Sequence, residues 1–580
     1  MQNPAPNLAD MSDEVPGGLD EPDALQPEQG ALALASPEDD WSEADWERAA
    51  AGVLRKTGRL STDDPDEAVW AALTRTTYDG LEVPPLGTPD HVTRSAHPRP
   101  NRVDGWDVRV WVGTDNAQVL AELECGATSL WVPAEDVSAD QLESLLDGVL
   151  LDLAPVVLEA PTVAHAETLT SLGALHPDTN LGATADADLV AMARLAARSG
   201  VRGIVVDAVA VHEEGASDAQ ELGWLLARGA QVLRVLERGG IDAERAFSLI
   251  ELRVAVTDEQ FPGIAKLRAL RVLWARLAEL CGVEDARTRV HAVTSRPMTS
   301  AYDVHVNLLR TTVAAFAAGV GGADAITIVP FDEPTGETST LGRRLARNIS
   351  ALLVDESHVA HVADPAGGAY AVERLTDDVC QAAWAELGRI EADGEQAFLA
   401  RVAEVKAWRE DDVARRRRPV TGLSEFANLA DPVPPRPNPS YRWGAAFEAF
   451  RADPPEQSVF LATLGPVAHH TARAGFAAHL LGAGGIAVDV AGATTGADEL
   501  VAAYAGQSVV CLAGADAAYA EWGKRAAEAL RGAGARHVVV VSTSSTDGRG
   551  STDDLAWADD VFCQGEDAVA FLTRTRTALR

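Results

Sequence analysis

Short β-branched runs alternate with helical stretches between about residues 106 and 330. The clearest helical pattern spans residues 306–320, where apolar residues recur at a 3-4-3-4 spacing and lie on one face of the predicted helix. Repeated strand–helix units require parallel strands joined by right-handed crossovers, and seven or eight units over about 260 residues predict a (β/α)8 TIM barrel over 101–411. The strand-like runs are 108–112, 129–132, 156–158, 203–206, 248–256, 290–293 and 325–329.

A second α/β domain follows a proline-rich segment. Residues 412–457 contain a basic run and then closely spaced prolines, which predict an extended linker without helix or central strand. Beyond it, five strand-like runs separated by helical segments predict a doubly wound, flavodoxin-like domain over 458–580. The ligands of such domains sit in the loops beyond the carboxyl ends of the strands. The runs are 459–464, 486–490, 508–512, 537–541 and 561–563.

The first hundred residues have a different texture. Residues 1–36 are acidic, interrupted by prolines and poor in aromatics, so we expect a disordered tail. Ser36-Pro37-Glu38 then resembles a helix start, and Trp41 and Trp46 lie on an amphipathic pattern. We therefore predict an N-terminal helical arm over 37–100; its apolar face either packs on its own domain or contacts a partner, and we expect partner contact.

Charge and cysteine content exclude several classes of protein. The chain carries 49 Lys and Arg against 87 Asp and Glu, a net charge of −38. Nucleic acids and anionic membranes are polyanions, so neither is an expected partner. The five cysteines are scattered without a metal-type or disulfide pattern, and the N-terminus shows no export signal. These features predict a soluble cytoplasmic protein.

Few sequence motifs point to chemistry on their own. No G-x-S-x-G, P-loop or H-E-x-x-H motif is present. His469 and His470 follow the first strand of the last domain, where an imidazole could ligate a metal, but no nearby carboxylate would orient it. His212-Glu213-Glu214 follows a barrel strand and could act in acid–base catalysis; a solvated charged loop is the commoner use of such a run. Gly482–Gly485 follows a helix and precedes a strand, the reverse of a nucleotide-binding loop.

Four stretches resemble the barrel of methylmalonyl-CoA mutases, and the order of barrel, linker and flavodoxin-like domain resembles that family over about residues 40–580. In catalytic members, adenosylcobalamin lies between the small domain and the barrel, and an acyl-CoA threads the barrel axis. A radical rearrangement there interconverts (R)-methylmalonyl-CoA and succinyl-CoA. The stretches are Gln260–Arg268, Arg310-Thr311-Thr312, Leu345-Ala346-Arg347-Asn348, and Asp364-Pro365-x-Gly367-Gly368-x-Tyr370 with Glu373.

The last domain departs from the family's cobalamin motifs. The D-x-H-x-x-G motif keeps its cobalt-ligating histidine as His469, but Val467 stands at the aspartate and Ala472 at the glycine. The S-x-L motif becomes 510–512 and lacks its hydroxyl, and the glycine pair after the fourth strand falls near 541–542, where side chains would occupy room that the cofactor's nucleotide tail needs. The resemblance thus implies that this chain does not hold the cofactor.

The barrel departs from the family in the same way. Val209 and Ala210 stand where the family has its catalytic tyrosine and histidine, and Val293 stands where it has a glutamine. The arginine that grips the substrate carboxylate corresponds to Gly182, and the tyrosine beside the radical falls near Asn101. The resemblance therefore implies no catalytic, cofactor-binding or metal-ligating residue in this chain.

These departures resemble the small (β) subunits of heterodimeric methylmalonyl-CoA mutases. Such a chain would be a non-catalytic partner of a homologous large (α) subunit, which binds adenosylcobalamin and acyl-CoA. Two other functions stay open: a self-sufficient acyl-CoA mutase that uses His469 and His212 in an altered site, or a protective or cobalamin-loading partner of the mutase.

Overall fold

The computed structural model describes residues 40–92, 105–184, 187–284, 286, 289–434, 437–542 and 555–580. Contacts divide the chain into two compact units, residues 1–74 and 75–580. The acidic tail 1–36 and Asn101 lie outside the described residues. None of the described helices is both long enough and apolar enough to cross a membrane.

The first unit contains two helices, α1 (Glu43–Lys56) and α2 (Ala68–Leu73). The helix start predicted at Ser36 lies outside the described residues, and α1 begins after Ser42, whose hydroxyl accepts a hydrogen bond from the Asp45 amide in a capping box. Trp46 packs against Trp70 with ring centres 4.9 Å apart over a small apolar core. Trp41 precedes the helix and is 78% exposed.

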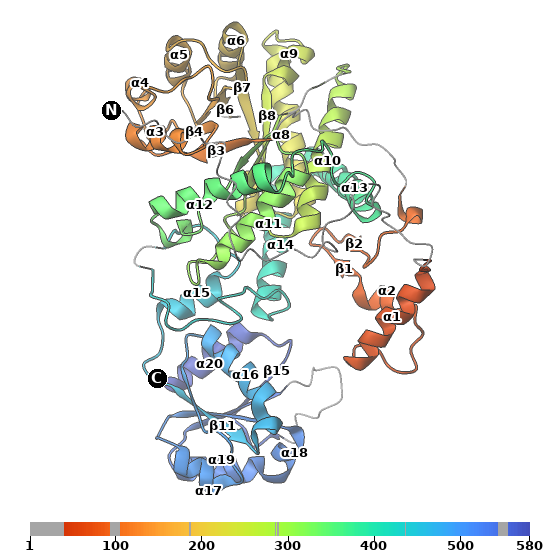
Figure 1. The fold of residues 1–580 in the computed structure, drawn as a ribbon, viewed down its shortest axis with the longest axis vertical. Coiled ribbons are helices and arrows are strands. Elements are labelled where there is room, and N and C mark those ends of the chain that lie inside the picture. The colour runs from red at the N-terminus through yellow and green to blue at the C-terminus, as the bar shows by residue number, and fades with distance from the viewer. Residues whose placement is uncertain are drawn as a thin grey trace, which may run out of the picture. The chain divides into compact units, whose positions relative to one another are not determined.

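The predicted barrel is present as a closed ring of eight parallel strands in the order β10-β3-β4-β5-β6-β7-β8-β9, surrounded by helices (Figure 1). The eighth strand, β6, was missing from the predicted set because its sequence Asn-Leu-Gly-Ala contains no β-branched residue. The strands are β3 (Asp107–Trp111), β4 (Ser129–Pro133), β5 (Val156–Glu159), β6 (Asn180–Ala183), β7 (Arg202–Asp207), β8 (Ile250–Val256), β9 (Arg289–Thr294) and β10 (Ala325–Thr327).

Helices follow the barrel strands, and many begin with side-chain caps such as Ser138, Thr162 and Ser217. The helical elements of this region are α3 (Asn116–Glu124), α4 (Ala139–Leu145), α5 (Val163–Ser171), α6 (Leu189–Ser199), α7 (Val209–Glu213), α8 (Asp218–Arg238), α9 (Ala243–Ser248), α10 (Gln260–Leu280), α11 (Val306–Val320), η4 (Glu333–Thr335), α12 (Thr340–Ala351) and the π-helical turn η5 (Leu352–Glu356).

Helix α11 has the predicted bounds, and its apolar stripe is only partly buried, with Val320 in the core. Leu309, on the apolar stripe, is 68% exposed, whereas Asn307, Thr311 and Ala314 on another face are buried. The buried face is made of small and polar residues because α11 packs closely on its neighbours: a Cβ on Gly263 of α10 would lie 3.2 Å from the Ala317 side chain.

Additional elements flank the barrel and occupy the linker. The long helices α13 (Tyr370–Asp393) and α14 (Glu395–Ala414) follow η5. The linker was predicted to be free of helix, but α15 (Ala445–Ala452) forms within it, in the proline-free stretch between Pro439 and Pro454. Before the barrel lie a short hairpin of β1 (Arg75–Thr76) and β2 (Glu82–Val83), and the turn η3 (Pro89–His91).

The C-terminal domain is a five-stranded parallel sheet in the order β12-β11-β13-β14-β15, as the flavodoxin-like prediction requires. Helices α16 and α20 lie on one side of the sheet and α17, α18 and α19 on the other (Figure 1). The elements are β11 (Val459–Leu464), α16 (Val467–Ala483), β12 (Val488–Val490), α17 (Ala497–Ala503), β13 (Val509–Gly514), α18 (Asp516–Ala518), η6 (Tyr519–Gly523), α19 (Lys524–Gly532), β14 (His537–Ser542), β15 (Asp560–Cys563) and α20 (Ala568–Leu579).

Candidate functional site

Two of the family-like stretches meet in the fold and hold it together. Arg268, from the Gln260–Arg268 stretch, forms ion pairs with Asp364 and with Glu373, the latter at 2.8 Å. Glu373 also accepts a hydrogen bond of 2.9 Å from the amide of Gly368, whose φ of +84° suits glycine. These residues therefore connect α10 to the start of α13.

The other two stretches are also occupied by structural contacts. Arg347 on α12 pairs with Glu122 on α3. Arg310 on α11 donates to the carbonyl oxygen of Thr421 at 2.8 Å and to the side chain of Asn307 at 2.8 Å. The retained family pattern thus stabilises the packing of the barrel helices.

His212 lies on α7 at the carboxyl end of β7 but is buried, so the expected solvated loop is wrong for this residue. Its Nε2 lies 2.8 Å from the Ser295 hydroxyl and its Nδ1 lies 3.2 Å from the Glu221 carboxylate. Glu213 pairs at 3.0 Å with Arg296, whereas Glu214 is exposed. Both ring nitrogens of His212 have partners within the protein.

The carboxylate beside His212 belongs to a buried ion-pair cluster. Glu221 accepts from Lys266 Nζ at 2.5 Å and from the Ala255 amide at 2.7 Å. Lys266 also pairs at 3.0 Å with Asp218. Burial alone would lower the pKa of Lys266, but Glu221 and Asp218 outweigh it and hold that pKa above its ordinary value. The cluster connects α7, α8 and α10 behind the barrel wall.

Charged side chains fill the barrel interior near the amino ends of the strands. Arg109 on β3 pairs at 2.5 Å with Glu251 on β8, and these strands are not neighbours, so the contact crosses the lumen. Arg289 on β9 pairs with the same carboxylate at 3.3 Å. Burial raises the pKa of Glu251, but the two arginines outweigh it and leave the pKa below its ordinary value.

The next layer of the interior is a stack around Trp131 on β4. Strand β8 lies on the opposite side of the barrel from β4, and the guanidinium of its Arg253 lies 4.0 Å from the centre of the Trp131 indole. His291 from β9 packs edge-on against the same indole, with ring centres 5.2 Å apart. Arg253 also pairs at 2.8 Å with Glu159 of β5. Burial and the nearby arginines lower the pKa of His291 well below its ordinary value, so the ring is neutral. We call Arg109, Trp131, Glu251, Arg253 and His291 the plug.

Apolar residues close the lumen at the carboxyl ends of the strands. Val209 and Val293, which stand at the family's tyrosine and glutamine positions, are buried in one cluster with Trp131. The same cluster contains Val157, Val205, Ala255 and Val329. The centre of this barrel is therefore a packed core.

Gly182, where the resemblance places the family's substrate-binding arginine, lies in β6 where the register with β7 is irregular. Its φ is +75°, and a Cβ added there would lie 1.8 Å from the carbonyl oxygen of Leu158. The backbone itself therefore excludes a side chain at this position.

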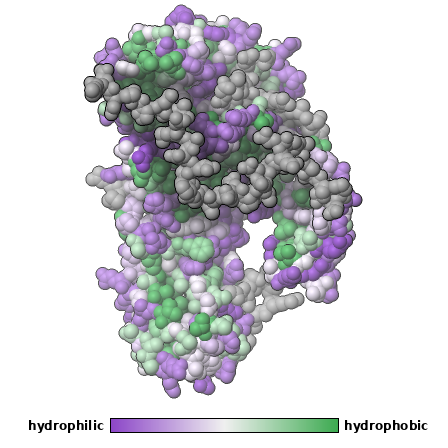
Figure 2. Space-filling model, viewed as in Figure 1, coloured by the Kyte–Doolittle hydropathy of each residue, from purple (hydrophilic) through white to green (hydrophobic). Residues whose placement is uncertain are grey.

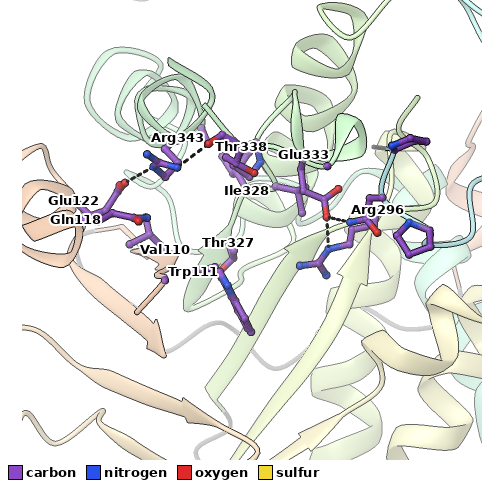
Figure 3. A pocket seen from close by; sticks show the side chains of 18 residues that line it. Val110, Trp111, Gln118, Glu122, Arg296, Thr327, Ile328, Glu333, Thr338 and Arg343 are labelled. Carbon is purple, nitrogen blue, oxygen red and sulfur yellow. Dashed lines mark hydrogen bonds and ion pairs between the residues drawn. The ribbon is translucent and has the colours of Figure 1, made fainter. Parts of the chain in front are cut away.

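A cavity of about 720 Å³ lies at the rim of the barrel, between β3, β10 and α12 (Figure 3). Trp111, which is 38% exposed, and Ile328 contribute apolar surface. Its charged residues are already paired: Arg296 lies 3.5 Å from Glu333, and the Glu122 carboxylate contacts the guanidinium of Arg343. The two arginines that line the cavity are thus already paired with carboxylates, so they offer little attraction to an anionic ligand.

In the C-terminal domain the cobalamin-like motif lies on a helix. Val467 is the first residue of α16 and is 60% exposed, and His469 is exposed in the same turn. His470 is buried, and its Nδ1 lies 3.1 Å from the Gly465 carbonyl oxygen, which only accepts hydrogen bonds. His469 thus has a free approach, but no carboxylate stands at the position that would orient it.

The loop edge of the sheet is filled by Tyr519. Its hydroxyl accepts from the Gly514 amide at 3.1 Å and lies 2.9 Å from the Val541 carbonyl oxygen, so it joins the carboxyl ends of β13 and β14. Cys511, the middle residue of the S-x-L counterpart, is fully buried, and burial raises its pKa to about 12.

The space between the sheet and α16 and α20 is also filled. Phe562 of β15 stacks on Phe476 of α16 at 6.0 Å and contacts Phe571 of α20 at 5.1 Å. The residues present therefore do not fit a buried nucleotide tail of cobalamin. Among the described residues, no group of three or more His, Cys, Asp or Glu could hold a metal ion.

Sequence reasoning missed the plug, although a signal was present. Glu251 and Arg253 are charged residues two positions apart inside an otherwise apolar strand, Ile250–Val256. Alternate residues of a strand face the same side, so two charges at this spacing in a buried strand indicate a polar interior. The structure thus defines a two-domain α/β protein whose barrel lumen is a packed core.

Comparison with known proteins places this architecture in a family. The model of the methylmalonyl-CoA mutase family matches residues 187–440. The methylmalonyl-CoA mutase small subunit of Streptomyces virginiae is 41% identical over 95% of this chain and 98% of its own length. The methylmalonyl-CoA mutase small subunit of Propionibacterium freudenreichii subsp. shermanii is 32% identical over 94% of this chain and 96% of its own length. The large subunit of Streptomyces virginiae is 33% identical over only 37% of this chain. The chain belongs to the methylmalonyl-CoA mutase family, together with the small subunits.

Proposed function

We propose that this chain is the non-catalytic subunit of an adenosylcobalamin-dependent methylmalonyl-CoA mutase. Its homologous large subunit would bind the cofactor and the acyl-CoA and perform the isomerisation between (R)-methylmalonyl-CoA and succinyl-CoA. The two chains would form a heterodimer in the cytoplasm.

The observation that carries the proposal is the plug. An acyl-CoA that threads a barrel axis needs an open lumen, but Trp131 and Arg253 meet there at 4.0 Å and Arg109 reaches Glu251 across it at 2.5 Å. Opening the axis would separate buried ion pairs, and breaking a single such pair costs about 3–5 kcal/mol.

The C-terminal domain supports the same proposal. Tyr519 closes the edge between β13 and β14, and the Phe476–Phe562 stack fills the space beside α16. His212, which a self-sufficient mutase could use, is held by Ser295 and Glu221. These contacts disfavour cofactor binding and proton transfer by this chain.

The test compares the isolated chain with a complex containing the large subunit. We expect the isolated chain to show neither turnover of methylmalonyl-CoA nor a spectral change on titration with adenosylcobalamin, and the complex to show both. Calorimetry with succinyl-CoA should give no binding heat for the isolated chain. A stoichiometric micromolar cobalamin complex of the isolated chain would refute the proposal.

A further inference from the structure

The amino-terminal end of the apolar stripe of α11 is exposed, whereas Val320 at its carboxyl-terminal end is buried in the core. Leu309 is 68% exposed, and Phe261 at the start of the adjacent helix α10 is 57% exposed. Apolar groups on the visible face of the molecule are separated by polar stretches (Figure 2). Exposed apolar side chains indicate a surface that another protein covers when they gather in one patch, so the segments beside these two residues decide their meaning.

The linker adds two more exposed apolar residues beside these helix starts. Arg418 pairs with Glu259, two residues before Phe261, at 3.0 Å, and the Thr421 carbonyl accepts from Arg310, next to Leu309, at 2.8 Å. The linker residues that follow are Phe426, 58% exposed, and Leu429, 43% exposed. We call Phe261, Leu309, Phe426 and Leu429 the linker patch.

Phe426 is held in a strained backbone conformation. Its φ is +56°, a left-handed value that costs a residue with a side chain about 1–2 kcal/mol. A tight turn fixes it, because the Gly422 amide donates to the Glu425 carbonyl at 2.8 Å and the Val420 amide donates to the Ser424 hydroxyl at 2.7 Å. Its ring meets His479 of α16 edge-on at 4.9 Å and still exposes more than half of its surface. Strain that keeps an aromatic ring exposed is typical of a functional position.

Charges around the linker patch are compensated, in contrast to the strongly acidic chain. The basic run is paired residue by residue: Arg416 lies 3.8 Å from Glu425, Arg417 2.7 Å from Asp412, and Arg418 3.0 Å from Glu259. A chain of net charge −38 repels acidic surfaces over much of its area. The patch is a place where another protein can approach with less repulsion.

We propose that the linker patch is the docking site for the homologous large subunit; this inference rests on the proposed function. All four residues lie within 187–440, the part that matches the family model, so a homologous partner carries a corresponding surface. Homologous chains can then associate about a pseudo-twofold axis, with equivalent surfaces in contact. Exposed aromatic residues are frequent energetic centres of such interfaces.

The test measures binding of full-length variants to the large subunit. Leu309→Asp and Phe426→Gly should each weaken the affinity at least about tenfold, as loss of an interface centre does. Phe426→Gly also relieves the left-handed strain, so the Tm of the isolated variant should stay equal or rise. Leu150→Asp and Leu153→Asp are the matched controls, because these leucines are 64% and 68% exposed and precede β5 at the other end of the barrel. The controls should bind like the wild type.

Three results would overturn the inference. If wild type and both patch variants bind the large subunit equally, the patch is not the docking site, and the proposed function is unaffected. If the isolated wild-type chain forms dimers that Leu309→Asp dissociates, the patch serves a second copy of this chain. If the wild type fails to bind the large subunit, the proposed function itself fails.

Discussion

Arg253 and Trp131 face each other across the barrel, with the guanidinium 4.0 Å from the centre of the indole ring. The two residues stand on β8 and β4, which lie opposite each other in the closed ring. Their contact fills the barrel axis, which the family resemblance assigns to the acyl-CoA in catalytic members.

Trp131→Ala should therefore destabilise the protein by about 3–5 kcal/mol, because it leaves a cavity and removes the cation–π partner of Arg253. Trp111, whose ring packs on Trp131 at 4.8 Å but is 38% exposed, provides the control. Trp111→Ala should lower the free energy of unfolding, measured by urea denaturation, by clearly less than Trp131→Ala does. Equal losses for the two variants would contradict a packed lumen.

Glu251→Gln should cost about 3–5 kcal/mol at pH 7, because it leaves Arg109 without its buried counter-charge and removes one of the carboxylates that pair with Arg289. The folded pKa of Glu251 lies below the ordinary value of 4.5, so its stabilisation is complete above that pH and is lost as the pH falls through the folded pKa. The difference in unfolding free energy between wild type and variant should shrink on acidification below pH 4.5. A difference independent of pH would argue against the ion pairs.

Asp79→Asn should have the opposite pH dependence. Asp79 accepts from the Ser217 hydroxyl and the Ala219 amide at the start of α8; burial and then Asp218 raise its pKa from 3.8 to about 6. A raised pKa favours folding at low pH, so this group's contribution declines as the pH rises through 6. The variant should gain about 1–1.5 kcal/mol relative to wild type between pH 5 and pH 7.5. Asp136→Asn, at an exposed carboxylate, should show no such trend in denaturant unfolding.

His212→Ala should lower stability by about 1–3 kcal/mol, since Ser295 and Glu221 each lose a buried partner. The specific activity of the assembled mutase should change less than twofold, and His469→Ala should change neither property. A loss of activity above tenfold with normal assembly, in either variant, would support the self-sufficient mutase instead.

Deletion of residues 1–60 should weaken assembly with the large subunit if the N-terminal arm contacts it, as the arm's exposed Trp41 leads us to propose. Co-elution on size-exclusion chromatography measures this, with Trp41→Ala as a milder variant that leaves the Trp46–Trp70 contact intact. An unchanged elution volume for the complex of the deleted chain would remove the arm from the interface.

The fold was largely predictable because its pattern is local. Five of five strands of the small sheet and seven of eight in the barrel lie where β-branched runs occur. The exception is β6, which carries Asn180 and Gly182. Strand propensities do not predict it, because its register is irregular and its glycine has a positive φ.

The interior and the surface were less predictable because each depends on tertiary neighbours. The apolar spacing of α11 marks one face but does not tell that Leu309 would be exposed while the small residues packed near Gly263 are buried. His212 has the sequence context of a loop, and only the fold brings Ser295 and Glu221 to its two nitrogens. The absence of family residues was readable in the sequence, but what fills their place was not.

Gly182 has a consequence for how this position can be varied. Its φ of +75° and the Leu158 carbonyl oxygen, 1.8 Å from where a Cβ would lie, exclude every other amino acid while β6 keeps its irregular register with β7. Any substitution, an arginine included, would first require β6 to take another register. Single substitutions therefore cannot tune position 182, because the path of this strand and the identity of this residue can change only together.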